Sequence, residues 1–361
     1  MNKLIRAYPS ITSIPEYAHM LSILETDSKN MAWVMNNFLL TRGFIPAGAP
    51  HVYNIDYFIV PDTWHDAADS TFSSRYNYAP SLSVCSLSIP EFSSIFFKNI
   101  IENVKQLIDD EFYVVLPLDV SKIDAYRITG PFLHNPLIFG YCESCEKVYM
   151  SDFVNGNKYD DFICSYKELA DGYRSLLQNV ERNKTSNNYW LNQCINIIRR
   201  TQVETHFDLS FFCLQLEDQI SPNRAKERYE VFERGNTRKQ FWGNSAYDGL
   251  ISYIKLCSSQ HKVCAVKPFH FIYDYAKSLR LRIEYVEKML LTQQSAFDNL
   301  LVINDELVRR SYSLRNSVLR NQFKGDILAQ DEFVNLVKQM KSQETEIIEK
   351  LLALINRGLE L

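Results

Sequence analysis

The chain of 361 residues, of which 46% are hydrophobic and 23% are charged, has the composition of a globular protein with two or three domains. Its formal charge of −4 at pH 7 excludes the basic footprint of a nucleic-acid-binding protein, and no apolar run approaches the roughly 18 residues of a membrane span. We therefore expect no nucleic-acid or membrane partner. Because the N-terminus lacks a long apolar signal segment, we also expect a cytoplasmic protein with reduced cysteines.

The N-terminal region is predicted to begin with a capped helix. Ser13 and Glu16 have the spacing of a capping box, and Pro15 stands in the first turn, so a helix is predicted over residues 15–25. The further elements predicted up to residue 110 are a helix over 32–40, short strands over 51–60 and 83–89, and a helix over 91–110.

An antiparallel sheet is predicted within residues 112–169. Its elements are a buried strand over 112–120, a hairpin over 137–141 and 147–152, a short strand over 162–165, and then a helix over 166–178. Helices followed by antiparallel strands indicate an α+β domain, which we place at residues 1–180. Residues 181–268 are predicted to be a mixed α/β connecting region, with a strand or helix over 207–216 and a helix over 247–256.

A helical bundle is predicted at the C-terminus, over residues 269–361. Residues 269–324 contain no glycine or proline, and a single straight helix of that length would span roughly 84 Å. Two antiparallel helices that bend near residues 292–295 are therefore predicted. Gly325 precedes a last helix, whose apolar face is interrupted by Glu344 and whose end is predicted at Gly358.

The first candidate for chemistry is His134, which opens the predicted hairpin. A histidine that acts as a general base needs a rigid mount and an acceptor that orients its second nitrogen. Asp152 ends the other strand of the hairpin and could lie beside His134, and Asn155 is a second possible orienting residue. Tyr17 and His19, on the early helix, could face the same pocket. The alternative is that all of these side chains serve helix packing, local capping or a turn.

A nucleophile to accompany His134 is not evident. A thiol at a helix N-terminus gains thiolate character, but the helix predicted over residues 15–25 contains no cysteine. Cys85 is the first cysteine of the chain, and its surroundings predict a strand. Ser13 and Ser22 are possible hydroxyl substitutes, although the capping box already explains Ser13.

A lone Cys-x-x-Cys, formed by Cys142 and Cys145, lies at the predicted hairpin turn. A zinc site would need two more ligands, and a thioredoxin-like redox motif would need a βαβ setting, so the third interpretation is a coincidence of sequence. The chain also contains no Walker A, GxGxxG or HExxH motif. We therefore predict no metal site and no cofactor of the protein's own.

A row of charged residues follows the first helix of the predicted bundle. Asp274 can pair with Lys277 or Ser278 one turn away, and Arg280 and Arg282 continue the row. The row is either a set of surface ion pairs or a face that contacts the catalytic domain or an acidic partner such as a carrier protein.

Together these pieces resemble a known family, the one named for butirosin biosynthesis protein H, through its N-terminal domain and the region after it. The matching pieces are Tyr17-Ala-His-Met-Leu-Ser-Ile-Leu24 with Trp33 and Asn36-Asn37, Tyr113-Val-Val-Leu-Pro-Leu-Asp119, His134, Phe139-Gly-Tyr141 with Lys147-Val-Tyr-Met-Ser-Asp152, Ser165-Tyr-Lys-Glu-Leu169, Tyr247-Asp-Gly-Leu250, and His270-Phe-Ile-Tyr-Asp-Tyr-Ala-Lys277 with Arg282. The resemblance covers most of the chain. Its specificity lies in the order of the pieces, since each is weak alone.

The resemblance implies a papain-like or C39-peptidase-like core with an antiparallel sheet, used as an acyltransferase. Such proteins act in antibiotic and other natural-product pathways, often beside nonribosomal peptide synthetases. They pass an acyl or peptidyl group from the phosphopantetheine thioester of a carrier protein to an amine. By this resemblance His134 would be the general base and Asp152 would orient it. The family's cysteine would fall near Glu16 or Tyr17, where this chain has no thiol.

Three hypotheses follow from the residues and the resemblance. The first is a carrier-dependent acyl or amide-bond transferase in which His134 deprotonates the amine directly. The second is a catalytically inactive papain-like protein that docks a synthetase or carrier protein, partly through Arg280 or Arg282. The third is a cysteine peptidase, which would require a thiol beside His134.

Overall fold

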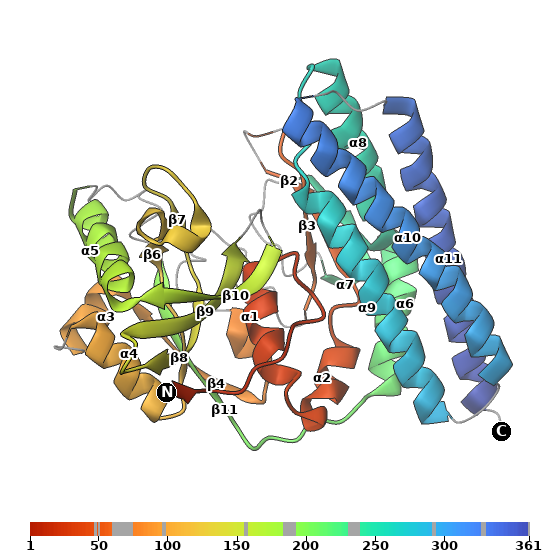
Figure 1. The fold of residues 1–361 in the computed structure, drawn as a ribbon. Helices are drawn as coiled ribbons and strands as arrows, with labels where there is room; N and C mark the ends of the chain where they lie inside the picture. Colours follow the sequence, from red (N-terminus) through yellow and green to blue (C-terminus); the bar gives the residue numbers. More distant parts are fainter. Residues whose placement is uncertain are drawn as a thin grey trace. The chain divides into compact units, whose positions relative to one another are not determined.

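The computed structural model describes residues 1–46, 49, 51–59, 75–95, 99–154, 158–182, 193–229, 239–290, 294–325 and 330–359. Within these ranges the fold is α+β, with antiparallel sheets and a helical C-terminal region (Figure 1). The chain divides into two compact units, each of which takes two segments of the sequence. Unit 1 comprises Met1–Met31 and Ala68–Thr205, and unit 2 comprises Ala32–Ala67 and His206–Leu361.

These units do not follow the ranges 1–180, 181–268 and 269–361 that the sequence predicts. Strand β11 (Cys194–Arg200), from the predicted connecting region, pairs with β4 (Leu82–Ser88) inside unit 1. Strand β12 (Lys239–Trp242) pairs with β2 (Thr41–Ile45) inside unit 2. Both pairings join segments that are more than a hundred residues apart, so local sequence patterns do not reveal them.

Unit 1 is built on an antiparallel sheet in the strand order β10-β9-β8-β5-β11-β4, with β1 also paired to β8. The other strands of the unit are β1 (Asn2–Lys3), β5 (Tyr113–Val115), β8 (Leu137–Cys142), β9 (Lys147–Val154), β10 (Lys158–Ser165), and the separate pair β6 (Leu118–Asp119) and β7 (Leu133–His134). The predicted hairpin is thus confirmed as β8 and β9. The predicted strand 112–120 is interrupted between β5 and β6.

The helices of unit 1 pack on this sheet and enclose a core of aliphatic side chains from α4, α5 and the strands. The helical segments are α1 (Pro15–Leu24), η1 (Ser28–Asn30), η3 (Arg75–Tyr78), α3 (Ile89–Ile95), α4 (Ile100–Asp109), η4 (Val120–Lys122), η5 (Asp124–Tyr126) and α5 (Tyr166–Arg182). The single helix predicted over 91–110 is wrong, because Asn99 is extended and its side chain caps the new helix α4 at Glu102.

The capping box predicted at Ser13 is also wrong, although the helix itself is confirmed as α1. The residue before the helix is Ile14, which is extended and makes no side-chain cap. The Ser13 hydroxyl is buried and has no hydrogen-bond partner in the described part of the chain. Because Ile14 is also buried, the packing of this segment into the core outweighs the local cap.

Unit 2 contains a three-stranded sheet in the order β12-β2-β3 and a set of long helices, of which α10 packs against both α9 and α11 (Figure 1). Its other elements are α2 (Met31–Asn36), β3 (Asn54–Tyr57), α6 (Leu209–Ile220), α7 (Pro222–Tyr229), η7 (Gly243–Ser245), α8 (Ala246–Ser259), α9 (Lys267–Leu290), α10 (Gln294–Lys324) and α11 (Gln330–Leu359). The two helices predicted in 269–324 are confirmed as α9 and α10, and the segment predicted as strand or helix over 207–216 is helical from Leu209 onward, in α6.

Two predicted helix ends differ from the structure. The helix predicted over 32–40 stops at Asn36, and Phe38 then takes a left-handed conformation with φ of 59°. Helix α11 passes through Gly358 and ends at Leu359, so this glycine does not stop it. None of the helices in the described ranges has the length and apolar content needed to cross a bilayer.

The charged row on α9 contains the predicted pair of Asp274 and Lys277, but Asp274 and Arg282 are buried, so the interpretation of these two residues as surface ion-pair partners is wrong. Asp274 is fully buried, with Lys277 at 3.6 Å and His270 at 3.8 Å. Arg282 is also buried and donates to the backbone carbonyls of Val34 and Asn37, which fasten the end of α2 to α9. These side chains therefore hold unit 2 together.

Glu344, which interrupts the apolar face of α11, is a buried carboxyl. Gln219 donates to Glu344 Oε1 at 2.8 Å, and Tyr247 donates to Glu344 Oε2 at 2.5 Å. Burial raises the pKa of Glu344 to about 7, although these hydrogen bonds and the charge of Lys341 partly oppose the rise.

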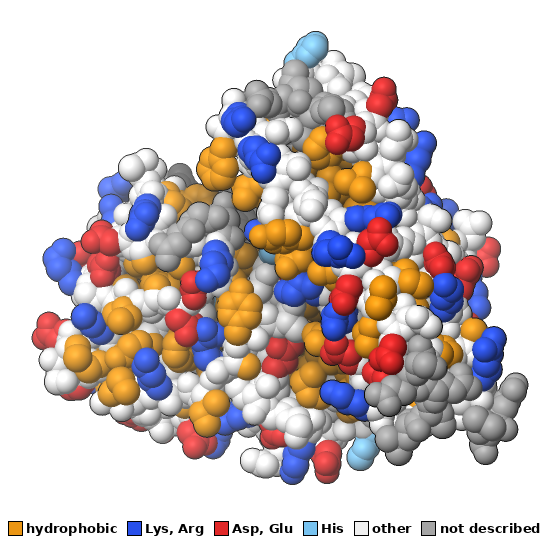
Figure 2. Space-filling model, turned by 45° about the vertical axis from the view of Figure 1, so that its right-hand side comes forward, with side chains coloured by type: hydrophobic (Ala, Val, Ile, Leu, Met, Phe, Trp, Pro, Cys, Tyr) orange, Lys and Arg blue, Asp and Glu red, His pale blue; other side chains and the backbone are white. Residues whose placement is uncertain are grey.

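Charges of both signs cover the visible surface. On the face drawn in Figure 2, lysines and arginines stand among aspartates and glutamates, with hydrophobic side chains between them. That face therefore carries no field of a single sign that would attract a highly charged polymer.

Candidate active site

The structure brings together His134 and Asp152, the two residues that the sequence predicts as base and orienting carboxylate. His134 ends β7, Asp152 lies in β9, and His134 Nδ1 stands 2.5 Å from Asp152 Oδ2. The aspartate side chain is fully buried, whereas the histidine side chain is 25% exposed. The imidazole is therefore held from inside the protein and is accessible from outside.

The alternation of the strand explains why Asp152 points inward. Val148, Met150 and Val154 belong to the core of unit 1, and Asp152 shares their face of β9 because alternate residues of a strand point the same way. A buried carboxylate needs hydrogen-bond donors to offset its lost hydration. Besides His134, the hydroxyl of Tyr126 donates to Asp152 Oδ2 at 2.5 Å.

These donors keep the carboxyl of Asp152 ionised. Burial alone would raise the pKa of Asp152, but the hydrogen bond from His134, the electrostatic interactions with His134 and His19, and the hydroxyl of Tyr126 together lower it. The second oxygen, Oδ1, is buried and has no hydrogen-bond partner among the residues that the structure describes. An ionised Asp152 fixes the proton of His134 on Nδ1 and leaves Nε2 as the basic nitrogen.

The other predicted histidine, His19, is positioned for a supporting role. It is fully buried on α1, where its Nε2 donates to the carbonyl of Asn135 at 3.0 Å and its Nδ1 accepts from Tyr159 at 2.9 Å. Burial lowers the pKa of His19, against an opposing effect of the Asp152 charge. Tyr17 is also fully buried. Both residues therefore lie inside the protein, and His19 ties α1 to the residue that follows His134.

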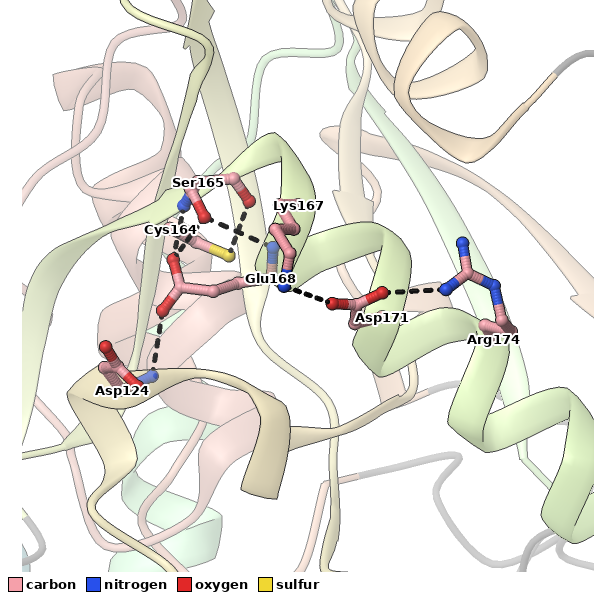
Figure 3. A network of polar contacts seen from close by, with 7 residues as sticks. All are labelled: Asp124, Cys164, Ser165, Lys167, Glu168, Asp171 and Arg174. Carbon is pink, nitrogen blue, oxygen red and sulfur yellow. Dashed lines mark hydrogen bonds and ion pairs between the residues drawn. The ribbon is translucent and has the colours of Figure 1, made fainter.

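The loop between β6 and β7, which carries Tyr126, is fastened to helix α5. Glu168, in the capping box at the start of α5, accepts from the backbone N–H of Asp124 at 3.0 Å (Figure 3). Further along α5, Ser175 donates to the buried Asp119 at 2.6 Å. Asp119 also accepts from the N–H of Phe132, two residues before His134, at 3.0 Å. Helix α5 thus fixes the loop of Tyr126, which bonds Asp152. Through Asp119 it also fixes the strand that carries His134.

The hydrogen bond described for His134 is to Asp152 and involves none of the predicted nucleophiles. Cys85 lies on β4, which is separated from β9 by three strands and hence by roughly 19 Å. The Ser22 hydroxyl donates to the carbonyl of His19, and the Ser13 hydroxyl has no partner. Within the described residues, the pair of His134 and Asp152 therefore has no hydrogen bond to Ser13, Ser22 or Cys85.

Sequence reasoning missed two residues of the site, Tyr126 and the anchoring residue Asp119. Tyr126 is one of 21 tyrosines, and no spacing links it to Asp152. Asp119 stands at the end of a predicted strand, a position typical of a capping carboxylate. In the structure it caps η4. Asn155 lies outside the described residues.

A conservative change at Tyr126 tests the buried carboxylate. Tyr126→Phe removes a hydrogen bond to an ionised group, so the free energy of unfolding is expected to fall by about 1.5–3 kcal/mol. The pKa of Asp152 is depressed in the folded protein, so its stabilising contribution is present above about pH 4 and is lost as the pH falls through the folded value. The variant should therefore begin to unfold in acid at a higher pH. Urea unfolding between pH 3 and 7 measures both effects.

Tyr173→Phe is the matched control for this measurement. The hydroxyl of Tyr173 bonds the exposed, neutral Ser93 at 3.2 Å, so its removal is expected to cost less than about 1 kcal/mol. Equal losses in the two variants, with the same onset of acid unfolding, would contradict a special role for Tyr126.

The described part of the chain contains no group of three or more His, Cys, Asp or Glu side chains arranged to hold a metal ion.

Comparison with known proteins adds no identification to this geometry. The chain matches no protein-family model. No curated protein matches its sequence. A function for the site must therefore be argued from its own geometry.

Proposed function

We propose that the protein is an acyl or peptidyl transferase of natural-product biosynthesis, with a papain-like core and with His134 as its general base. The donor would be an acyl group held as a phosphopantetheine thioester on a carrier protein or nonribosomal peptide synthetase, and the acceptor would be an amine. The observation that carries this proposal is the pairing of a solvent-accessible imidazole with a fully buried carboxylate. Such a pair is the base and orienting group of acyl-transfer enzymes.

The proposed reaction needs no covalent intermediate. His134 Nε2 accepts a proton from the amine while the amine nitrogen attacks the thioester carbonyl. The tetrahedral intermediate then collapses, the carbon–sulfur bond breaks, and the proton returns from His134 to the departing phosphopantetheine thiolate. Asp152 stabilises the imidazolium that exists between these two proton transfers.

The papain-like part of the proposal is supported by the placement of α1. His19 bonds the carbonyl of Asn135, the residue after His134, so α1 lies against the strand that carries the proposed base. Glu16 is one helical turn before His19 on the same face and is partly exposed. The resemblance places the family's cysteine at this turn, near Glu16 or Tyr17.

A second candidate function is favoured by the surroundings of two predicted nucleophiles: the Ser22 hydroxyl donates to the carbonyl of His19, and Cys85 lies on β4, three strands away from β9. In this alternative the protein is catalytically inactive and docks a carrier protein or synthetase. The buried position of Arg282 removes it from the docking surface that the sequence predicts. Arg280 is paired with Glu284 at 2.9 Å and also with Asp305.

Intact-mass analysis of an acyl-loaded carrier protein distinguishes the two functions. The carrier is incubated with a panel of amines, with and without this protein. Loss of the acyl group together with an amide product supports the transferase. An intact carrier that co-elutes with this protein supports docking, and an intact carrier that does not bind contradicts both functions.

A thiol introduced at position 16 tests whether the amine attacks the thioester directly, without an acyl intermediate on the protein. Glu16→Cys would place a thiol on the turn of α1 that faces the strand of His134. With the direct mechanism the natural protein gives amide without any acyl adduct on itself, whereas this variant is expected to gain an acyl adduct that His134→Ala abolishes. An acyl adduct on the natural protein would contradict direct attack, and peptide mapping would then locate the nucleophile.

A further inference from the structure

The tip of the β8–β9 hairpin holds two cysteines that the proposed transfer reaction does not use. Cys142 ends β8, and Cys145 stands in the turn that leads to β9. The hydroxyl of Ser144 lies 3.5 Å from Cys142 Sγ and 3.8 Å from Cys145 Sγ. Both sulfurs therefore lie against the same hydroxyl in the reduced protein.

We propose that Cys142 and Cys145 form a redox-active dithiol that exchanges with low-molecular-weight disulfides, of which oxidised glutathione is the probe. In the first step the Cys145 thiolate attacks one sulfur of the small disulfide, and one small thiolate leaves. In the second step the Cys142 thiolate attacks the sulfur of Cys145, and the second small thiolate leaves. The protein is oxidised by two electrons to an intramolecular disulfide, and the small disulfide is reduced to two thiols.

The exposure of the two cysteines fits this order of events. Cys145 is exposed, whereas Cys142 is 4% exposed, so an external disulfide or thiol reaches the sulfur of Cys145 first. The thiol of Cys145, the hydroxyl of Ser144 and the N–H of Cys145 lower the pKa of Cys142, as does the positive N-terminus of the chain. A thiol with a lowered pKa is a good leaving group when an external thiol reduces the disulfide again.

The surroundings of the turn support reversible oxidation at this site. The backbone N–H of Tyr166 donates to the carbonyl of Glu146 at 2.9 Å, which fastens the turn to the start of α5. Glu143, the acidic residue after Cys142, is neutralised by Lys105 at 2.6 Å. From Lys147 to Asp152 the hairpin extends for roughly 17 Å, so the dithiol is separate from the proposed transfer site.

Peptide mapping after oxidation tests the proposal. The reduced full-length protein is incubated with oxidised glutathione, blocked with an alkylating reagent and digested with trypsin. The peptide 128–147, which contains only Cys142 and Cys145, is expected to lose two hydrogen masses and to resist alkylation. Cys142→Ser is expected to stop at a stable glutathione adduct on Cys145. Cys145→Ser is expected to give no intramolecular disulfide.

A second pair of cysteines, Cys257 and Cys264, serves as the internal control. Both thiols are buried in unit 2 and are expected to react only after unfolding. Two alkylatable thiols in the oxidised wild-type peptide would overturn the proposal. A wild-type protein that stops at the glutathione adduct would also overturn it. So would one zinc ion per chain in native mass spectra that protects both thiols of the hairpin from alkylation, since the site would then bind metal.

Discussion

Replacing His134 with alanine is expected to lower the rate of amide formation by about 10²–10⁴-fold, the usual contribution of a positioned general base. The amine must lose a proton during attack on the thioester, and His134 is the proposed acceptor. The variant is expected to be folded but less stable, because the buried Asp152 loses one hydrogen-bond donor and keeps that of Tyr126. The rate is measured by intact-mass analysis of the acyl carrier, and folding by circular dichroism and urea unfolding.

His206→Ala is the matched control, since His206 is an exposed histidine in the loop before α6. Its rate is expected to equal that of the unchanged protein. Asp152→Asn provides the complementary test: the amide cannot favour the same tautomer, so the rate should again fall by orders of magnitude if His134 is the base. An unchanged rate in His134→Ala, with the fold intact, would refute the assignment and leave docking as the better function.

Replacing Glu344 with glutamine is expected to remove a large pH dependence from the stability of unit 2. The pKa of the buried Glu344 is about 7 in the folded protein, whereas a glutamate in the unfolded chain has a pKa of about 4.3. Folding therefore binds a proton at pH values between these two. The stabilisation is fully present below about pH 4.3 and is lost as the pH rises through 7, and the whole shift corresponds to about 4 kcal/mol.

The experiment compares urea unfolding of the natural protein and the variant at several pH values between 5 and 8. The natural protein should lose about 2–3 kcal/mol of stability over this range relative to Glu344→Gln, which keeps a similar shape and hydrogen-bonding groups. Glu349→Gln, an exposed glutamate on the same helix, is the control and should behave as the natural protein does. Parallel curves for the natural protein and Glu344→Gln would show that Glu344 does not take up this proton.

The sequence predicted those parts of the fold and site that depend on local pattern. The hairpin of β8 and β9 follows from two short apolar runs around a turn, and its register carries Asp152 to a position beside His134. Helices α9 and α10 follow from a long segment without glycine or proline. In both cases the residues that decide the structure are close together in the chain.

The features that sequence reasoning missed depend on distant partners. Tyr126 reaches Asp152 only because helix α5 anchors the loop through Glu168 and Ser175, and these contacts join residues that are 26 to 56 positions apart. The capping signal at Ser13 failed because burial in the core decides the path of that segment. Patterns that specify one turn are overruled where the tertiary environment supplies the larger energy.

The interleaved path of the chain sets the order in which the protein can fold during synthesis. Strand β2 ends at Ile45, but its partner β12 begins at Lys239, so at 5–20 residues per second the partner emerges roughly 10–40 s later. Until then one edge of β2 has unsatisfied backbone groups that can pair with other chains. A ribosome that stalls before residue 239 thus holds a nascent chain with an open strand edge, and early termination there is expected to give an aggregation-prone fragment.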